Sequence, residues 1–357
     1  MYPQLVIDLN KIRNNLNKIS EMVKNTGCSL MIVTKGYCAD EEIFKVLEAS
    51  DIDFLADSRV QNLKKYVNSK KGKVLLRLPM GSEADDVVRY ADLSLNSELS
   101  TIKKLNEAAA AQNKVHNILL MIDLGDLREG IFFKNEDEIF NTVEEILKLK
   151  NIKLYGVGVN LTCYGAVIPK NENLSQLIEI AKKIENKFSI KLEMISGGNS
   201  SSLHLIGKKE LPKGITNLRV GEAFLLGDET AYSQMLEGFY DDAFVLEAEI
   251  IELKEKQSVP IGETGVDAFG NRPVYEDRGI IKRAILAVGK QDVDSDNLHP
   301  IDSKIEILGG SSDHLILDVT KSDKEYKVGD IVKFKLSYSS LLRSTTSAYV
   351  GKTYLNK

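Results

Sequence analysis

The feature of this sequence that most constrains its fold is a regular alternation between residues 29 and 227. Short runs of apolar and β-branched residues are each followed by a longer polar segment with helical periodicity. Eight such runs occur, near residues 30–35, 53–57, 73–78, 92–96, 117–123, 154–160, 192–196 and 216–221. Strands that alternate with helices indicate parallel βα units, and eight units predict a closed (β/α)8 barrel of the TIM type. An open doubly wound sheet is the alternative, but the first run lacks the glycine-rich turn that binds dinucleotides in such sheets.

The pattern changes near residue 230. Beyond this point helical stretches disappear, and turns rich in glycine, proline and aspartate separate short apolar runs. We therefore expect an α/β barrel over residues 1–230, followed by a C-terminal all-β domain over residues 231–357. Residues 1–9 contain a further strand-like run that precedes the barrel units, and this run is a candidate partner for the β domain.

The composition favours a small-molecule partner and a reducing compartment. The 47 Lys and Arg residues and 52 Asp and Glu residues are interspersed and give a net charge of -5, so we expect no nucleic-acid partner. The three cysteines are an odd number without CxxC spacing, which argues against a disulfide framework and favours the cytoplasm. No apolar stretch approaches the roughly 20 residues of a membrane helix, so we expect no membrane partner.

Lys35 follows directly on the first apolar run of the barrel and is itself followed by glycine. A lysine at the apolar mouth of a strand loses hydration, so its amine can deprotonate and attack a carbonyl group. Most lysines that follow a buried strand are ordinary solvated loop residues. The interest of Lys35 therefore depends on the residues at the ends of the other strands.

The seventh run ends in residues 196–202, which read SGGNSSS. Two glycines let the backbone approach an anion closely, and serines can cap a helix whose amides point at it. Because phosphate is commonly bound after strands seven and eight of a barrel, this segment is a candidate phosphate site. The alternative is an ordinary glycine turn with an N-capping serine.

Other strand ends carry cationic and amide side chains. The eighth run ends with Arg219, Gly221 and Glu222, the fifth is followed by Arg128, and the sixth ends with Asn160. The alternative for Arg219 is a salt bridge to Glu222 or Glu229. Pyridoxal phosphate needs an amine, a phosphate site and a partner for its ring nitrogen, so this set of residues matches that cofactor.

On these residues the chain resembles the alanine racemase superfamily of pyridoxal-phosphate enzymes, over nearly its whole length. The resemblance implies that Lys35 is the Schiff-base lysine and that Arg128 lies near the cofactor's phenolic oxygen and the substrate carboxylate. It also implies that Arg219 contacts the pyridine nitrogen and that the protein is an amino-acid racemase without a metal.

The resemblance extends to the phosphate ligands. Ser200 and Gly221 are similar to two of them, and Tyr349, six residues after Arg343, is similar to a phosphate-binding tyrosine. The usual tyrosine four residues after the Schiff-base lysine is missing, because Tyr37 follows Lys35 by two residues. The remaining expected cofactor-binding residues are Asn160, Asn199 and Glu222.

Two segments resemble in particular the members of the superfamily that racemise ornithine, namely residues 158–170 and 259–270. The expected reaction is therefore interconversion of L- and D-ornithine, with lysine, alanine or several amino acids as alternative substrates. A non-catalytic pyridoxal-phosphate carrier resembles the barrel alone, so the β domain argues against it. Decarboxylases and metal-assisted dehydratases or aldolases of this scaffold generally use a C-terminal cysteine, and no cysteine follows Cys163.

Racemisation requires an acid/base group on each face of the substrate. Alanine racemase supplies the second group as a tyrosine from the partner subunit, but the comparable stretch here, residues 284–292, has Lys290 and Asp292 instead. Residues 311–314 resemble a partner-subunit segment near the substrate carboxylate, which adds Asp313 and His314 as candidates. The alternative for these residues is a solvated loop charge or a β-turn.

The same resemblance implies a homodimer in which each β domain completes the active site of the other subunit. An unpaired ammonium group in a closed site is costly, so the side chain of ornithine should meet an acidic residue. Asp267 and Asp292 are the candidates for that contact.

Overall fold

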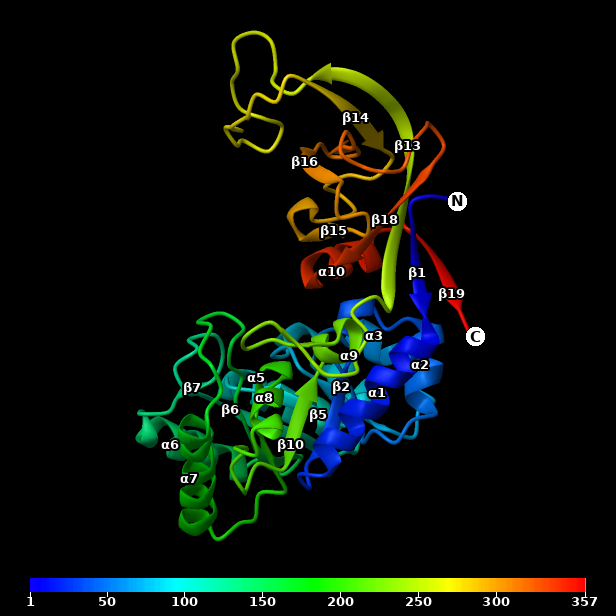
Figure 1. Ribbon diagram of the computed structural model, residues 1–357. Coiled ribbons are helices and arrows are strands. Elements are labelled where there is room, and N and C mark those ends of the chain that lie inside the picture. The colour runs from blue at the N-terminus through cyan, green and yellow to red at the C-terminus, as the bar shows by residue number, and fades with distance from the viewer. Residues whose placement is uncertain (357) are drawn as a thin grey trace. The chain divides into compact units, whose positions relative to one another are not determined.

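The computed structural model describes residues 1–356, which divide into two compact units (Figure 1). Residues 12–239 form one unit, and residues 1–11 together with residues 240–357 are assigned to the other. The prediction placed this division at residue 230. Residues 231–239 stay with the barrel unit because Leu236 N donates to Gly227 O (2.8 Å) and Asn14 Nδ2 donates to Gly238 O (3.1 Å). None of the helices in the described part of the chain is long and apolar enough to cross a membrane.

The first unit is a closed barrel of parallel strands, as predicted. Its strands are β2 (Ser29–Val33), β3 (Phe54–Asp57), β4 (Gly72–Leu75), β5 (Leu93–Asn96), β6 (His116–Asp123), β8 (Ile152–Gly158), β9 (Met194–Ser196) and β10 (Asn217–Val220). Each strand pairs in parallel with the next, and the pairing of β10 with β2 closes the barrel. A short strand, β7 (Ile131–Phe132), pairs only with the end of β6.

Helices lie around these strands in Figure 1. They are α1 (Leu9–Lys24), α2 (Glu41–Glu48), α3 (Val60–Leu63), α4 (Ala84–Tyr90), α5 (Leu99–Ala111), α6 (Glu136–Leu147), α7 (Asn171–Phe188), α8 (Leu203–Gly207) and α9 (Glu222–Leu226). In α7 the buried residues Leu174, Leu177 and Ala181 recur at spacings of three and four, which is the pattern of a helix with one face on a core. Asp40 caps α2 by accepting hydrogen bonds from Glu42 N and Ile43 N, so this helix begins immediately after the turn that carries Lys35.

The barrel interior explains why functional side chains gather at its carboxyl end. Met31 and Val33 of β2 belong to a buried cluster with residues of β3, β4, β5, β6 and β9. Strand β2 ends at Val33, and Lys35 begins the short turn that follows it at the mouth of the barrel. Arg219 pairs in register with Met31 across β10 and β2, so it also faces the interior.

The second unit is mostly antiparallel β structure. Its strands are β1 (Gln4–Asp8), β13 (Phe244–Gln257), β14 (Ile280–Leu286), β15 (Leu298–Pro300), β16 (Glu306–Gly310), β17 (Leu315–Asp318), β18 (Ile331–Leu336) and β19 (Gly351–Leu355). Strand β1 pairs antiparallel with β13 and parallel with β19. The segment between β13 and β14, drawn in yellow, projects as a loop without regular structure (Figure 1).

This unit is not wholly β structure, because it contains the helix α10 (Tyr338–Thr346). The prediction of an all-β domain missed this helix. Its sequence, YSSLLRSTT, is rich in serine and threonine, which have modest helix propensity. Ser340, Leu341, Ser344 and Thr345 are nevertheless buried on one face, so packing supplies the stabilisation that propensity does not.

Candidate active site

Lys35 begins a short 3-10 turn, η1 (Lys35–Tyr37), directly after β2. Its side chain is half-buried at the mouth of the barrel. No residue within the described range 1–356 forms a hydrogen bond or ion pair with its ammonium group. Lys35 does act electrostatically on the carboxylates of Asp57 and Glu222. Lys35 is therefore an amine without a hydrogen-bonding partner in the described residues, and Asp57 and Glu222 are its acidic neighbours.

Asp57 ends β3 beside Lys35 and was not among the residues predicted for the site. It is fully buried and accepts hydrogen bonds from Thr34 Oγ1 (2.5 Å), Arg59 N (2.8 Å) and Asn62 Nδ2 (3.1 Å). Burial raises the pKa of this carboxyl, while the hydrogen bonds and the charge of Lys35 oppose the shift. Because Thr34 precedes Lys35 in the chain, Asp57 fixes the backbone from which the lysine projects.

Tyr37 lies in the interior instead of at the mouth. Its ring is fully buried and packs edge-to-face against Phe224, with 5.9 Å between the ring centroids. Burial raises the pKa of its phenol well above the ordinary value. Tyr37 therefore does not replace the phosphate-binding tyrosine that the superfamily carries after its lysine.

The candidate phosphate site joins the loops that follow β9 and β10. Ser200, which is buried, accepts hydrogen bonds through Oγ from Gly221 N (3.2 Å) and Ala223 N (3.3 Å). Asn199, not a serine, caps the 3-10 turn η4 (Ser200–Ser202) by accepting from Ser201 N (2.8 Å). At Gly221 a Cβ atom would lie 3.1 Å from Val33 Cβ, so glycine lets this backbone pass close to β2. Two backbone amides that follow β10 thus converge on the Ser200 hydroxyl of the loop after β9.

Glu222 is the first residue of α9 and is half-buried. Burial raises the pKa of its carboxyl to about 7, with a further increase from Asp228 and an opposing effect of Lys35. The alternative prediction, a salt bridge from Arg219 to Glu222 or Glu229, is not found among the described residues.

Arg219 is buried, with 3% of its surface exposed. Its Nη1 donates to Ser196 Oγ (2.6 Å), and its Nη2 donates to Val159 O (2.6 Å). Burial lowers the pKa of the guanidinium to about 10, so the group still carries a charge at neutral pH. Arg219 is therefore a fixed hydrogen-bond donor inside the barrel mouth.

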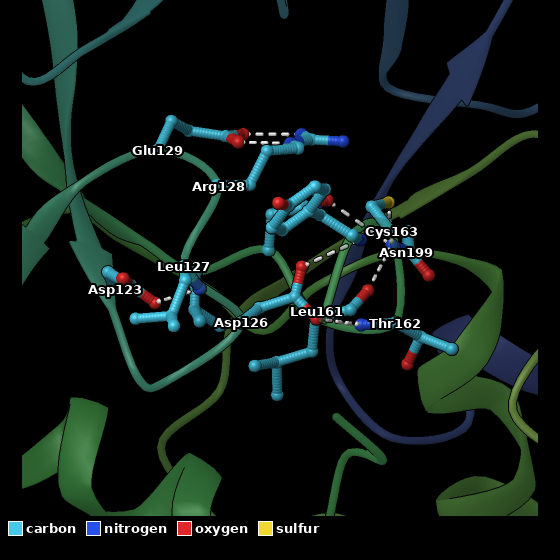
Figure 2. A network of polar contacts seen from close by, with 12 residues as sticks. Asp123, Asp126, Leu127, Arg128, Glu129, Leu161, Thr162, Cys163 and Asn199 are labelled. Atoms are coloured by element: carbon cyan, nitrogen blue, oxygen red, sulfur yellow. Dashed lines mark hydrogen bonds and ion pairs between the residues drawn. The ribbon is translucent and has the colours of Figure 1, made fainter. Parts of the chain in front are cut away.

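Arg128 and Glu129 form a two-point ion pair at the end of the loop after β6 (Figure 2). The guanidinium Nε and Nη2 both donate to the Glu129 carboxylate, and this bond raises the pKa of Arg128. The Asn160 amide lies between Arg128 and Asn199. In one orientation its oxygen accepts from Asn199 Nδ2 (3.2 Å), and in the other it accepts from Arg128 Nη2 (3.1 Å) and Nη1 (3.3 Å). Glu129 was not predicted, although its position beside Arg128 was visible in the sequence.

The remaining predicted residues belong to the second unit. The turns at residues 289–293 and 311–314 lie side by side there, because Lys290 N donates to Ser311 O (2.9 Å) and Gln291 N to Ser312 O (3.0 Å). This arrangement brings the turn that contains Lys290 next to the turn that contains Asp313 and His314. The Lys290 ammonium also lies 4.5 Å from the ring centroid of Phe269.

Asp292, Asp267, Asp313 and Tyr349 are the other candidates of this unit, and they differ in solvent exposure and in hydrogen bonding. Asp292 is buried and accepts a hydrogen bond from Ser347 Oγ (2.6 Å). Asp267 accepts bonds from Phe269 N (2.9 Å) and Asn271 N (2.8 Å) within its own turn. Asp313 is exposed and pairs with His314 Nδ1 (2.9 Å), and Tyr349 is 72% exposed. Asp313 and Tyr349 are thus the more accessible of these side chains.

The barrel residues fit pyridoxal phosphate in chemical type. An uncommitted amine, a glycine-containing pair of loops with converging amides and a buried guanidinium lie on one rim. These are the groups required for an aldehyde, a phosphate and a ring nitrogen. The fit rests on this donor set.

Residues 7–228 of the chain match the family model described as the alanine racemase N-terminal domain. An ornithine racemase from Acetoanaerobium sticklandii is 56% identical over 355 residues, which cover 99% of this chain and 100% of that protein. A lysine racemase from Thermotoga maritima is 39% identical over 359 residues, which cover 99% of each chain.

The fold is also similar to solved structures of low sequence identity. An alanine racemase from Streptomyces lavendulae has a TM-score of 0.74 and 15% identity, with 99% of this chain and 97% of that chain covered. An alanine racemase from Clostridium difficile 630 has a TM-score of 0.73 and 18% identity, with 99% and 95% covered. At these identities the likeness concerns the fold alone.

Proposed function

The chain belongs to the alanine racemase family, and from this premise we propose that it is a pyridoxal-phosphate-dependent racemase that interconverts L- and D-ornithine. The structural observation that carries the proposal is Lys35, an amine without a hydrogen-bonding partner in the described chain, at the barrel mouth that also presents Arg219 and Ser200. The 56% identical relative is an ornithine racemase, which favours ornithine as the substrate.

We assign the residues that would hold the cofactor as follows. Lys35 would bind its aldehyde, Arg219 would donate to its ring nitrogen, and Arg128 would serve both the cofactor's phenolic oxygen and the substrate carboxylate. The phosphate and its surroundings would be contacted by Asn160, Asn199, Ser200, Gly221, Glu222 and Tyr349. When bound, pyridoxal phosphate supplies an electron-withdrawing group that makes the α-hydrogen of an amino acid acidic.

The protein's own residues would manage the protons. Lys35 would take and return a proton on one face of the substrate. Arg219 retains its proton at neutral pH, so it would donate a hydrogen bond without transferring charge. For the other face we propose Lys290, with Asp313 as the next candidate. Asp292 is the weakest of the three because its carboxylate is buried and bonded to Ser347.

We also propose a cytoplasmic homodimer whose active sites are shared between subunits. A site of this kind would unite the barrel of one chain with the Lys290 and Asp313 turns of another. The second candidate substrate is lysine, because the Thermotoga maritima relative is a lysine racemase. Both substrates carry a terminal ammonium group, so an acidic side chain would be needed in either case.

The test is to incubate the purified protein and pyridoxal phosphate with L-ornithine, L-lysine or L-alanine and to separate the enantiomers by chiral chromatography. We expect D-ornithine to form fastest. Borohydride reduction should attach the cofactor to Lys35, and Lys35→Ala should abolish both attachment and turnover.

Lys45→Ala is the matched control, because Lys45 is an exposed lysine of α2 that forms ion pairs only with Glu41 and Glu42 in the described chain. Lys45→Ala should retain both attachment of the cofactor to Lys35 and turnover. Release of carbon dioxide in place of D-ornithine, or full activity of Lys35→Ala, would contradict the proposed function.

A further inference from the structure

The loop that follows β8, residues 160–168, lacks regular secondary structure yet has a defined path. Thr162 and Ala166 adopt left-handed backbone conformations, with φ of 68° and 53°, and residues 163–166 are exposed. Leu161 is buried near the start of the loop, but the exposed residues 163–166 need polar anchors to hold their position.

The main anchor is Asp126, in the loop after β6. Its side chain is 1% exposed. Oδ1 accepts hydrogen bonds from Thr162 N (2.9 Å) and Val167 N (3.2 Å), and Oδ2 accepts from Tyr164 N (3.0 Å). Figure 2 shows the carboxylate beside Thr162. All three partners are backbone N–H donors on the other loop, so they are satisfied only by a side chain with two acceptor oxygens, such as the aspartate carboxylate.

A second anchor is Asn199, from the loop after β9. Its Nδ2 donates to Leu161 O (2.9 Å) and to Cys163 Sγ (3.3 Å), while its Oδ1 caps η4 beside Ser200. The 160–168 loop is therefore tied at one side to the segment that carries Arg128 and at the other to the candidate phosphate site. Asn160, at its start, lies between Arg128 and Asn199.

The backbone of the two loops is also in close contact at Gly165. A Cβ atom on this residue would lie 2.7 Å from Asp126 O and 3.1 Å from Asp126 Cα. Glycine is thus needed for the approach that brings the amides of the 160–168 loop onto the carboxylate.

We propose that Asp126 is a positioning residue that fixes the 160–168 loop as a preformed wall of the substrate site and thereby holds Asn160 against Arg128. The expected effect on substrate binding rests on the proposed function, whereas the anchoring of the loop does not. A preformed wall lowers the cost of ordering groups when substrate binds. Asp126 itself forms no hydrogen bond with Lys35 or with the loops after β9 and β10, so its effect should be larger on substrate affinity than on cofactor affinity.

The test uses the holoenzyme with Asp126→Asn. The replacement keeps one acceptor oxygen but turns an NH2 group toward backbone donors, so at least one of the three amides loses its partner. We expect hydrogen–deuterium exchange of the peptide containing residues 160–168 to increase about tenfold. We also expect the KM for L-ornithine to rise about tenfold, with kcat and the affinity for pyridoxal phosphate changed less than threefold.

Glu229→Gln is the matched control. Glu229 is also buried and accepts bonds from three backbone amides, Ala231 N (2.9 Å), Tyr232 N (3.0 Å) and Gln234 N (3.3 Å). Those amides belong to its own loop, so exchange of residues 160–168 should stay unchanged in this variant. Equal exchange of residues 160–168 in both variants would overturn the proposal.

Gly165→Ala is a second variant that disturbs the contact between the two loops, and it can be used if Asp126→Asn folds poorly. Its Cβ must displace the loop from Asp126, so the same exchange and KM changes are expected. Unchanged exchange and KM in this variant would overturn the proposal. The exchange measurement does not require turnover, so it tests whether Asp126 anchors the 160–168 loop even in a protein without activity. Failure of the wild-type protein to racemise ornithine would refute the proposed function and not the loop anchor.

Discussion

At the scale of single residues, the charge of the barrel mouth depends on a carboxyl that titrates near neutrality. Glu222 is half-buried at the start of α9, and burial raises its pKa to about 7, with Asp228 adding to the shift and Lys35 opposing it. At pH 6 Glu222 is therefore mostly neutral, and at pH 8 it is mostly charged. The electrostatic surroundings of Lys35 change across this interval.

Replacement of Glu222 by glutamine should reveal this titration in the stability of cofactor-free protein. A carboxyl whose folded pKa exceeds its unfolded value of 4.5 stabilises the fold fully below that value, and the stabilisation is lost as pH rises through the folded pKa. Glu222→Gln should therefore gain roughly 2 to 3 kcal/mol relative to wild type between pH 4 and pH 8. Urea unfolding at a series of pH values measures the difference.

The control for this experiment is Glu107→Gln, on the exposed surface of α5. It makes the same chemical change without the buried environment. If the difference between wild type and Glu222→Gln stays constant from pH 4 to pH 8, the assignment of a raised pKa to Glu222 is wrong.

The residue scale also marks the limit of what the sequence could predict. The position of Lys35 at the end of a barrel strand was predictable, because it directly follows the first apolar run, which forms β2. Asp57 and Asp126 were not, although each follows or ends a barrel strand. Their roles depend on which backbone amides and hydroxyls approach them from other loops, and sequence spacing does not encode that approach.

At the scale of elements, a buried polar contact joins β5 to β6. Ser94 Oγ and His116 Nε2 are 2.8 Å apart, and Asn96 Nδ2 donates to the same hydroxyl (2.9 Å). All three side chains are buried. Burial lowers the pKa of His116 to about 4, an effect that Asp92 opposes and Lys114 reinforces. The histidine is therefore neutral at physiological pH and contributes to the strand contact in that form.

We expect this histidine to contribute to acid sensitivity. A base whose folded pKa is lowered stabilises the fold above its unfolded pKa of 6.5, and the stabilisation is lost as pH falls through the folded pKa. The stability advantage of wild type over His116→Gln should thus shrink by roughly 2 to 3 kcal/mol between pH 7 and pH 4. Thermal or urea unfolding at both pH values tests this expectation.

Ser94→Ala separates the hydrogen bond from the titration. It leaves the histidine in place without its hydroxyl partner, and loss of a buried partner costs about 1 to 3 kcal/mol at neutral pH. Its acid dependence should resemble that of wild type. An acid dependence of His116→Gln equal to that of wild type would refute the neutral buried histidine.

The elements themselves were largely predictable. All eight barrel strands lie where the apolar runs placed them, because buried parallel strands are apolar on both faces and are read directly from composition. Helix α10 was missed because its serine and threonine residues give a weak local signal and its burial depends on the β sheet. The start of the second unit shifted to residue 240 because the hairpin of β11 (Asp228–Glu229) and β12 (Gln234–Met235) belongs to the barrel unit.

At the scale of the whole molecule, the proposed reaction draws on both units. The uncommitted lysine belongs to the barrel, and the accessible candidates for the second acid/base group, Lys290 and Asp313, belong to the β unit. In the proposed homodimer the two sets come from different chains. A site shared between two chains allows two inactive variants to complement each other, whereas a site within one chain does not.

Two inactive variants should therefore restore activity to each other. One chain carries Lys35→Ala, and the other carries both Lys290→Ala and Asp313→Ala. Random reassortment makes half of the dimers mixed, and each mixed dimer has one site built from the intact barrel of one chain and the intact β unit of the other. About a quarter of all sites should then be functional. Racemisation of L-ornithine after co-expression measures this fraction. A site contained within one chain would give no recovery, because every site would retain at least one lesion.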